Sequence, residues 1–425
     1  MSTVTRARTV RRALALYARR HTRLVAFAAV VGPGVLAGLS DDDPAGITTY
    51  SILGADFGYR LLWVLLLSTV ALVVFHELGA RMGCVTGRGL AGLIRDRYGH
   101  RAAVSAAAVL LVANVGTTCA EFAGIAAASE LAGVSRYASV PVAAILVSLL
   151  VVRGGFKRVE HVLLLLATVF LTYFASGVLA HPHWSAAARG LVVPALPLQR
   201  HALVVATATV GTTLAPWGLA FIQSYAVDKR LRPSDLALER VDVIAGAVMT
   251  GVIGFFIVIA CAATLHVSGR SINDAGDAAA ALRPLAGSFS STLFGVGLLG
   301  AALLAAAILP LSTAYSVSEA LGREARVEAS IREEPVFYGT YALVVGVGAL
   351  VVLAPGAPLV PILFITQAIN AVLLLPLLVF IALLTRDRSL MGEYATGRAW
   401  TVVIVAVTLM IAAATVLLGV VLAGS

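Results

Sequence analysis

Long apolar runs separated by short polar segments dominate the chain. A run of about 20 apolar residues can cross the hydrocarbon core of a bilayer as an α-helix. Eleven runs fit this pattern, although the fourth is short and the first and eighth are long. The predicted spans are 24–54, 60–82, 101–131, 137–152, 160–180, 201–226, 241–267, 289–318, 336–355, 359–384 and 398–423. The pattern therefore predicts an all-α membrane protein with eleven transmembrane helices.

The basic residues between the spans predict the orientation of the chain. Cytoplasmic loops of membrane proteins are enriched in Lys and Arg. With the N-terminus in the cytoplasm, 25 of the 31 Lys and Arg residues fall on the cytoplasmic side and six on the other. One missed span would scramble this alternation. We therefore expect a multi-pass protein of the cell (inner) membrane, with a cytoplasmic N-terminus and an extracytoplasmic C-terminus.

Composition supports a membrane domain. The chain is 60% hydrophobic and 12% charged, about half the charged fraction of a typical soluble domain. Orientation explains the net charge of +9 better than nucleic-acid binding does. No short apolar run with a small-residue cleavage site follows the N-terminal arginines, so we expect no removed signal peptide. The predicted organisation is a basic cytoplasmic arm, 1–23, and one transmembrane domain, 24–425.

Two spans are interrupted by Gly and Pro near their middle. Residues 32–34 read Gly-Pro-Gly and residues 40–46 read Ser-Asp-Asp-Asp-Pro-Ala-Gly, while residues 214–218 read Leu-Ala-Pro-Trp-Gly. Interruptions five spans apart predict two inverted repeats with a binding site where the broken helices meet. The repeats are 24–180 and 201–384, followed by an extra helix, 398–423. Two independent proline kinks are the alternative.

Three consecutive carboxylates, Asp41, Asp42 and Asp43, lie in the first interruption. An ionised Asp at the centre of a membrane helix costs roughly 2.5–3.5 kcal/mol. A hard divalent cation offsets that cost, because Mg²⁺, Mn²⁺ and Ca²⁺ prefer carboxylate and carbonyl oxygens. The triplet could instead lie in a loop, but Arg23 and Arg60 place it near the middle of a long apolar stretch. Spacing alone does not decide which carboxylate binds metal.

Three motifs resemble those of one transporter family. Residues 43–46, Asp-Pro-Ala-Gly, are similar to the Asp-Pro-Gly-Asn motif in the first helix of Nramp metal transporters. Residues 80–88, Ala-Arg-Met-Gly-Cys-Val-Thr-Gly-Arg, resemble the Nramp segment after helix 2. Residues 387–393, Asp-Arg-Ser-Leu-Met-Gly-Glu, resemble the segment before helix 11. The resemblance covers most of the chain and implies a LeuT-like 5+5 fold that carries divalent metal ions.

The resemblance also implies a metal site and suggests its selectivity. Asp43 takes the place of the family's metal-binding Asp, and Gly46 replaces its Asn partner. The family's Met-Pro-His in helix 6 is Ala215-Pro216-Trp217 here. Without the Met thioether, the site offers oxygen ligands and more room, which suits a partly hydrated Mg²⁺ with Mn²⁺ as a second substrate. At these positions the chain resembles the Nramp-related magnesium transporter branch.

Proton coupling is expected to be weak or absent. The family's helix 3 carries an Asp three residues before a Glu, and these positions are Thr118 and Glu121 here. Trp217 replaces the family's helix 6 His and does not titrate. A proton relay needs groups that gain and lose protons. Glu121 is either a structural carboxylate or part of the ion pathway.

Four further polar residues complete the candidate site. Gln367 and Asn370 could supply amide oxygens to the metal or its water shell, or could form interhelical hydrogen bonds. Thr212 and Thr213 lie in the second interruption, where their hydroxyls could cap freed backbone groups or contact a bound water. We interpret His76 and Glu77, near the cytoplasmic end of span 60–82, as packing or gating residues.

Two other transport functions remain open. One is proton-coupled Mn²⁺/Fe²⁺ symport of the Nramp type. The other is transport of an organic substrate such as an amino acid, whose carboxylate the Asp cluster would repel. The sequence contains no HExxH, GxSxG or phosphate-loop motif, so we expect no enzyme activity. We expect no cofactor, and as partners only the transported ion and the lipid bilayer, with no nucleic acid or obligate protein partner.

Overall fold

The computed structural model describes residues 42–152, 168–228, 230–323 and 331–423, and these contain helices and turns but no strand. The long helices are α4 (Leu62–Thr86), α6 (His100–Leu131), α7 (Arg136–Val152), α13 (Leu236–Cys261), α16 (Ser290–Ala320), α17 (Pro335–Leu353), α18 (Leu359–Arg386) and α20 (Arg398–Ala423). Three half-length helices lie among them: α3 (Pro44–Phe57), α11 (Arg200–Thr213) and α12 (Pro216–Asp228). The shorter elements are α5 (Leu90–Tyr98), η1 (Thr168–Leu171), α9 (Thr172–Leu179), α10 (Trp184–Val192), η2 (Pro233–Asp235), η3 (Ala262–His266), α14 (Ala275–Ala279), η4 (Ala280–Leu282), α15 (Arg283–Ala286), η5 (Gly287–Phe289), α19 (Arg388–Met391) and η6 (Gly392–Tyr394).

The helices follow the predicted spans closely. Eight helices within the described ranges are long and apolar enough to cross a membrane, α11 and α12 together counting as one, and α7 is a shorter apolar helix. The largest shift is in α13, which starts five residues before the predicted 241 and ends in the π-helical turn η3. The first half of span 24–54 and the start of span 160–180 lie outside the described residues. The all-helical membrane fold is therefore confirmed, whereas the number eleven stays a prediction.

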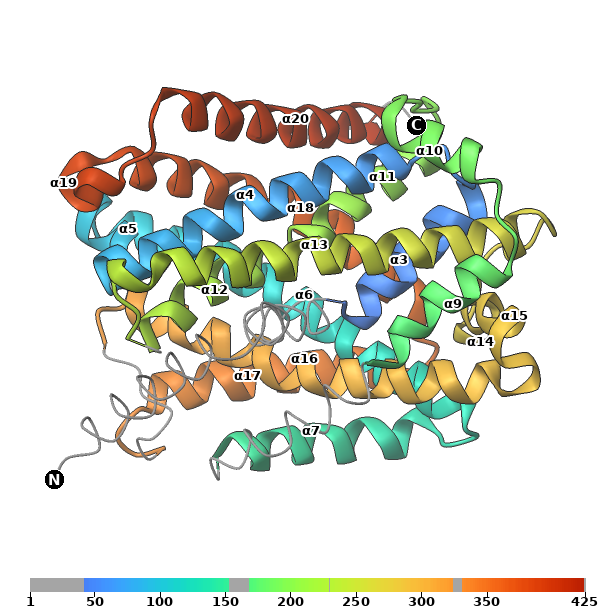
Figure 1. Ribbon diagram of the computed structural model, residues 1–425. Helices are drawn as coiled ribbons and strands as arrows, with labels where there is room; N and C mark the ends of the chain where they lie inside the picture. Colours follow the sequence, from blue (N-terminus) through green and yellow to red (C-terminus); the bar gives the residue numbers. More distant parts are fainter. Residues whose placement is uncertain (1–41, 153–167, 229, 324–330, 424–425) are drawn as a thin grey trace, which may run out of the picture.

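The half-length helices lie at the centre of the bundle. The second half of the first span, α3, packs against α11, α13, α18 and α6. Around this core, α6 packs along α16 and α18, and α4 packs along α12 and α13. The outermost helices are α7 at one edge and α20 at the opposite edge (Figure 1). Only 17% of the apolar window of α20 is buried, which is typical of a helix that faces lipid.

Small residues let the central helices approach closely. A Cβ added to Gly54 on α3 would lie 2.5 Å from the carbonyl oxygen of Val258 on α13. A Cβ added to Gly124 on α6 would lie 2.5 Å from the Cβ of Pro44, the first residue of α3. Small residues at helix contacts are typical of membrane bundles, where packing replaces the hydrophobic effect. The start of α3 is thereby held against α6.

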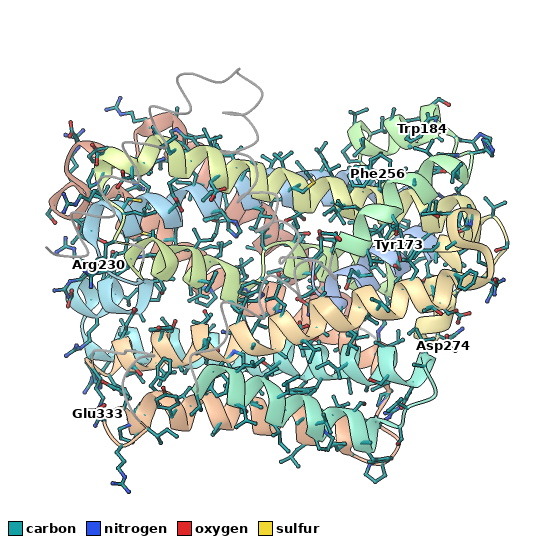
Figure 2. The ribbon with its side chains drawn as sticks, turned by 60° about the horizontal axis from the view of Figure 1, so that its bottom comes forward. Tyr173, Trp184, Arg230, Phe256, Asp274 and Glu333 are labelled. Carbon is teal, nitrogen blue, oxygen red and sulfur yellow. The ribbon has the colours of Figure 1, made fainter. Side chains whose placement is uncertain are left out.

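Polar side chains gather at the two ends of the bundle. Arg230 and Glu333 lie at one end, and Trp184 and Asp274 lie at the opposite end (Figure 2). The short helices α5 and α19 lie at the first end, and α10, α14 and α15 lie at the second (Figure 1). Loops predicted to lie on the same side of the membrane, such as those of Arg230 and Glu333, are therefore found at the same end of the described bundle.

Candidate functional site

The site begins at Asp43, where the chain changes from extended to helical. Asp43 has φ −74° and ψ 167°, and the next residue, Pro44, opens α3. Pro is favoured at this position because its ring presets the helical φ. The Oδ1 of Asp43 accepts a hydrogen bond of 2.6 Å from the backbone N–H of Gly46. Asp43 is therefore the N-cap of a buried half-helix, with its carboxylate at the positive end of the helix dipole.

A second carboxylate of the triplet, Asp42, lies beside Asp43. Asp42 is buried next to Asp43 in the extended segment before α3. Asp41 lies outside the described residues, as does the Gly-Pro-Gly interruption at 32–34. The structure therefore places two of the three predicted carboxylates deep inside the bundle, on the non-helical side of the break.

The second interruption lies between α11 and α12, as the sequence predicts. Helix α11 ends at Thr213, Leu214 and Ala215 leave the helix, and α12 begins at Pro216. In a continuous helix the carbonyl of Thr212 would accept a hydrogen bond from residue 216. Pro216 has no N–H, so that carbonyl is freed. The negative end of the α11 dipole thus offers backbone oxygens near the first break.

The two interruptions meet through Thr212 and Gly46. A Cβ added to Gly46 would lie 3.2 Å from Thr212 Oγ1 and 3.3 Å from Asp43 Oδ1. The hydroxyl of Thr212 therefore lies where a side chain at position 46 would project. This places a carboxylate oxygen and a hydroxyl oxygen beside the same small gap. The predicted site residues Asp43, Gly46 and Thr212 are brought together.

Glu121 on α6 joins this group. It is fully buried, its carboxyl lies close to that of Asp43, and neither of its oxygens has a hydrogen-bond partner among the described residues. Ionised carboxylates only accept hydrogen bonds. Two of them side by side need a proton or a cation between them. This neighbour was predicted as a candidate, but its contact with Asp43 was not.

Thr118, one turn before Glu121, packs in another direction. A Cβ added to Gly348 on α17 would lie 2.8 Å from Thr118 Cγ2. Thr118 is buried, and its hydroxyl has no hydrogen-bond partner among the described residues. It therefore fills the contact between α6 and α17 rather than the gap beside Asp43.

Gln367 and Asn370 form a pair on α18. The side-chain amide of Asn370 donates to Gln367 Oε1 at 3.0 Å and to Thr117 Oγ1 on α6 at 2.9 Å. The backbone of Gln367 lies so close to Gly211 on α11 that a Cβ there would clash with its carbonyl oxygen. The pair thus lies beside the last turn of α11 and one turn from Glu121. It makes the interhelical hydrogen bonds that the sequence left as one of two alternatives.

Trp217 is buried in the first turn of α12 against α16. It packs in one cluster with Leu304 and Ile308, and Ala215 lies at the edge of that cluster. The indole N–H has no hydrogen-bond partner in the described part of the chain. His76 of α4 lies next to this turn, since a Cβ added to Gly218 would be 3.5 Å from its Nε2. The side chains of α12 near the break are therefore apolar, with one imidazole beside them.

The sequence reasoning missed two residues that fix the site. Tyr50 Oη lies 2.9 Å from Thr213 Oγ1, and Thr213 itself donates to the carbonyl of Thr209. Thr117 receives the hydrogen bond from Asn370. Helical spacing in the sequence could have pointed to both residues, because Tyr50 is seven residues after Asp43 and Thr117 is four before Glu121. The hydroxyl of Thr213 bonds within its own helix, so a role in capping freed backbone groups stays a prediction.

The described residues include no group of three or more His, Cys, Asp or Glu side chains that could hold a metal ion. A cation at Asp43 would be bound largely by backbone carbonyls, hydroxyls and water. Such oxygen ligands suit hard cations.

Comparison with known proteins identifies the family. The sequence model of the Nramp family, described as natural resistance-associated macrophage protein-like, matches residues 34–421. The chain belongs to the Nramp family. The match covers residues 40–46 of the first interruption, the whole second interruption, all the candidate site residues and most of the helix after the second repeat.

Curated relatives of this Nramp chain are named divalent metal cation transporters. MntH of Acidiphilium cryptum is 33% identical over 279 residues, which are 63% of this chain and 64% of that protein. MntH of Aeromonas hydrophila is 28% identical over 377 residues, 86% of this chain and 89% of the relative. The alignment with the Acidiphilium protein therefore spans less than two thirds of its length.

Solved structures share the fold. A mutant of the manganese transporter of Eremococcus coleocola superposes with a TM-score of 0.72 at 20% identity, covering 94% of this chain and 87% of that one. Mhp1, a nucleobase–cation symport-1 family transporter, superposes with a TM-score of 0.59 at 14% identity, covering 91% and 90%. At these identities the likeness concerns the fold alone, and that fold is LeuT-like. The predicted LeuT-like helical fold is confirmed, whereas the helix count and the bounds of the repeats stay predictions.

Proposed function

We propose that this Nramp protein carries divalent metal cations across the cell membrane, with Mg²⁺ as the main substrate and Mn²⁺ as a second one. Its relatives are named divalent metal cation transporters, which supports the general class. Membership of the Nramp family argues against an organic substrate. The proposal includes uptake with weak or no proton coupling.

One observation carries the proposal: the carboxyls of Asp43 and Glu121 lie together, buried, between a helix start and a helix end. Two buried carboxylates are tolerated only when positive charge offsets them. A divalent cation that arrives at Asp43 supplies this charge. Asp43 is the proposed central ligand. Beside it lie the hydroxyl and the freed backbone carbonyl of Thr212, the backbone of Ala215 and the gap left by Gly46.

The proposed preference for Mg²⁺ rests on the ligands at the second interruption. Ala215 stands where a thioether would provide a soft ligand, and Thr212 lies near the gap left by Gly46. The proposed metal ligands are therefore all oxygen atoms. Mg²⁺ keeps several waters when bound and needs few direct protein ligands, whereas soft ligands favour heavier metals. Gln367 and Asn370 are proposed to contact the water shell rather than the ion.

The proposed weakness of proton coupling rests on Trp217 and Thr118. Trp217 is packed against α16 by apolar neighbours, and Thr118 faces α17. Neither gains or loses a proton. Without a relay, flux follows the metal gradient and the membrane potential, which is inward for a cation when the interior is negative. The proposed orientation has the N-terminus and the α5 and α19 end in the cytoplasm.

A second candidate function is proton-coupled Mn²⁺/Fe²⁺ symport. The observation in its favour is Glu121, which lies beside the proposed ligand and could exchange a proton for the arriving cation. His76 near the start of α12 is a second titratable neighbour.

Purified protein in liposomes separates the two functions. Separate inward gradients of Mg²⁺, Mn²⁺ and Ca²⁺ are imposed, with a metal-sensitive dye and a pH dye inside. We expect Mg²⁺ and Mn²⁺ entry without matching acidification. Mn²⁺ entry with stoichiometric acidification and no Mg²⁺ entry would establish the symport alternative instead.

A further inference from the structure

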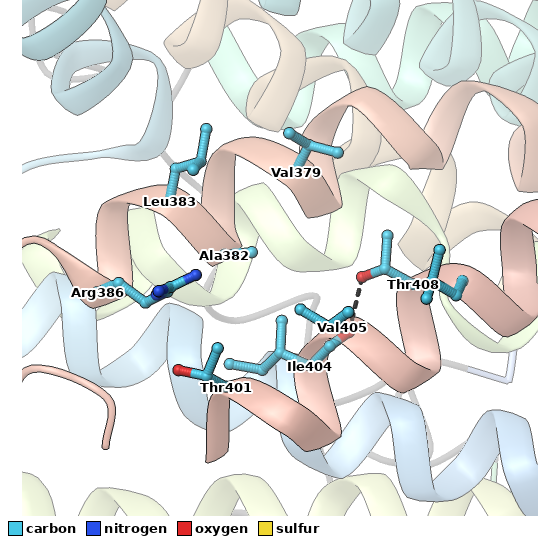
Figure 3. Close-up of a pocket in the computed structure, with 9 residues that line it drawn as sticks. Val379, Ala382, Leu383, Arg386, Thr401, Ile404, Val405 and Thr408 are labelled. Atoms are coloured by element: carbon cyan, nitrogen blue, oxygen red, sulfur yellow. Dashed lines mark hydrogen bonds between the residues drawn. The ribbon is translucent and has the colours of Figure 1, made fainter. Parts of the chain in front are cut away.

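A groove between α18 and α20 lies outside the transport site. It has a volume of about 200 Å³, and the nine residues that line it are Val379, Ala382, Leu383, Arg386, Thr401, Ile404, Val405, Thr408 and Leu409. Figure 3 shows the lining side chains on the two helices. All of them belong to the last helix of the second repeat or to the extra helix.

The groove is polar at one end and apolar along the rest. Arg386, the last residue of α18, and Thr401, in the first turn of α20, lie at the same end (Figure 3). The Thr401 hydroxyl donates to the carbonyl of Gly397 and that of Thr408 to the carbonyl of Ile404. Both hydroxyls are thus satisfied by their own helix. Arg386 is left as the single charged group that the lining presents.

The charge of Arg386 is not neutralised by its neighbours. Asp387 accepts hydrogen bonds from the backbone N–H and the hydroxyl of Ser389, at 2.8 and 2.6 Å, and pairs with Arg97 at 2.6 Å. Arg386 itself is exposed and forms no ion pair with a described residue. This end of the groove therefore carries one positive charge without an ion-pair partner among the described residues.

The groove opens toward the bilayer. The exposed fractions of Val379, Leu383, Val405 and Leu409 are 48%, 45%, 43% and 63%. Trp400, next to Thr401, is 40% exposed. Trp is enriched at the membrane–water interface, so Trp400 places Arg386 at head-group depth. From Arg386 the groove follows α18 inward for seven residues to Val379, about 10 Å at 1.5 Å per residue.

We propose that this groove binds an anionic phospholipid, with the head-group phosphate on Arg386 and one acyl chain along the apolar lining. The depth of about 10 Å fits within one leaflet of a core about 30 Å thick. A basic residue above an apolar groove between membrane helices matches the two parts of such a lipid, and basic pockets on the cytoplasmic side bind anionic head groups. A free phosphate would leave the apolar lining without a partner.

Native mass spectrometry of the full-length protein in detergent tests the site. Dioleoyl phosphatidylglycerol and dioleoyl phosphatidylcholine are titrated separately, and inorganic phosphate is added as a competitor. We expect one tightly retained phosphatidylglycerol per chain, weaker binding of phosphatidylcholine and no displacement by phosphate. Arg386→Gln removes the head-group contact and should weaken phosphatidylglycerol binding about fivefold. Val405→Trp fills the groove and should abolish retention.

Two matched variants serve as controls. Arg388→Gln removes an exposed arginine outside the lining, and Val403→Trp adds the same bulk on another face of α20. Both should bind phosphatidylglycerol within about twofold of the original protein. Equal retention of both lipids, displacement by phosphate, or unchanged binding in both Arg386→Gln and Val405→Trp would overturn the proposal. A dimer mass that Val405→Trp converts to monomer would show that a second copy of the chain occupies the groove, which would also overturn it.

Discussion

The carboxyl of Glu121 on α6 lies close to that of Asp43 at the start of α3, deep in the bundle. Asp43 is also an N-cap, so replacing it by Ala removes a helix cap together with the charge. Asp43→Asn separates the two roles, because an amide oxygen still accepts from the N–H of Gly46. We expect this variant to lose about tenfold or more of Mg²⁺ and Mn²⁺ uptake in liposomes, since a buried charge contact with a cation exceeds about 1.4 kcal/mol. An unchanged melting temperature controls for folding, and full flux would reject Asp43 as the ligand.

Glu121→Gln tests proton coupling at the same place. Gln fills the same space but does not exchange a proton. With weak coupling, we expect metal entry to persist and the internal pH to stay constant. The measurement is metal and pH dye fluorescence in the same liposomes. Loss of an acidification signal that the original protein produces would support the symport alternative.

Ala215→Met tests metal preference. The added thioether is a soft ligand next to the break before α12, so entry of Mn²⁺ and Cd²⁺ should rise relative to Mg²⁺. Ala215→Leu is the matched control, because it adds similar bulk without sulfur. Uptake assays in which two metals compete measure the ratio of Mn²⁺ or Cd²⁺ entry to Mg²⁺ entry directly. The proposed effect of the thioether on metal preference is rejected if both variants change this ratio equally or if neither changes it.

Glu77→Gln tests the buried charge cluster near the α5 and α19 end. Glu77 on α4 accepts from Arg81 and, at 2.7 Å, from Arg240 on α13, and Arg81 also lies 5.6 Å from the ring centre of Trp400. Removing the shared carboxylate leaves Arg81 buried without its counter-charge, which typically costs about 3–5 kcal/mol. We expect a clear drop in melting temperature in detergent.

The control for that cluster is Arg240→Gln. The Arg240 side chain is 42% exposed, so its loss should cost only about 0.2–1 kcal/mol. Equal melting temperatures for Glu77→Gln and the original protein would show that the cluster is not a stabilising element.

Orientation is tested with single cysteines at the two ends. The three native cysteines are buried, so the background for a membrane-impermeant maleimide is low. On intact cells we expect labelling of Asp274→Cys, at the α14 end, and not of Glu333→Cys, at the other end. Permeabilised cells should label both. The reverse pattern would invert the proposed topology.

The helices could be predicted because the length of an apolar run decides whether a segment spans a membrane. The break at Pro216 was likewise predictable, because proline removes a helical hydrogen bond whatever surrounds it. The short helices α5, α10 and α19 were not predicted, since they lie at the ends of the bundle and lack long apolar runs.

The rotation of each helix was not available from the sequence. In a membrane both faces of a helix are apolar, so hydrophobicity does not tell which side meets a neighbour. Thr118 and Glu121 are three residues apart, yet one packs on α17 and the other meets Asp43. The contact of Glu77 with Arg240 joins residues 163 positions apart, and no local pattern predicts it.

The close approach of Gly211 to Gln367 has a mechanical consequence. With backbone touching backbone and no room for even a methyl group between them, the last turn of α11 stays fixed against α18 for as long as this contact persists. Access to Asp43 from the α10 end then depends on the other helices shifting around that pair. A hinge for alternating exposure is therefore to be sought at Leu214 and Ala215, just beyond the pair, where the chain has already left the helix.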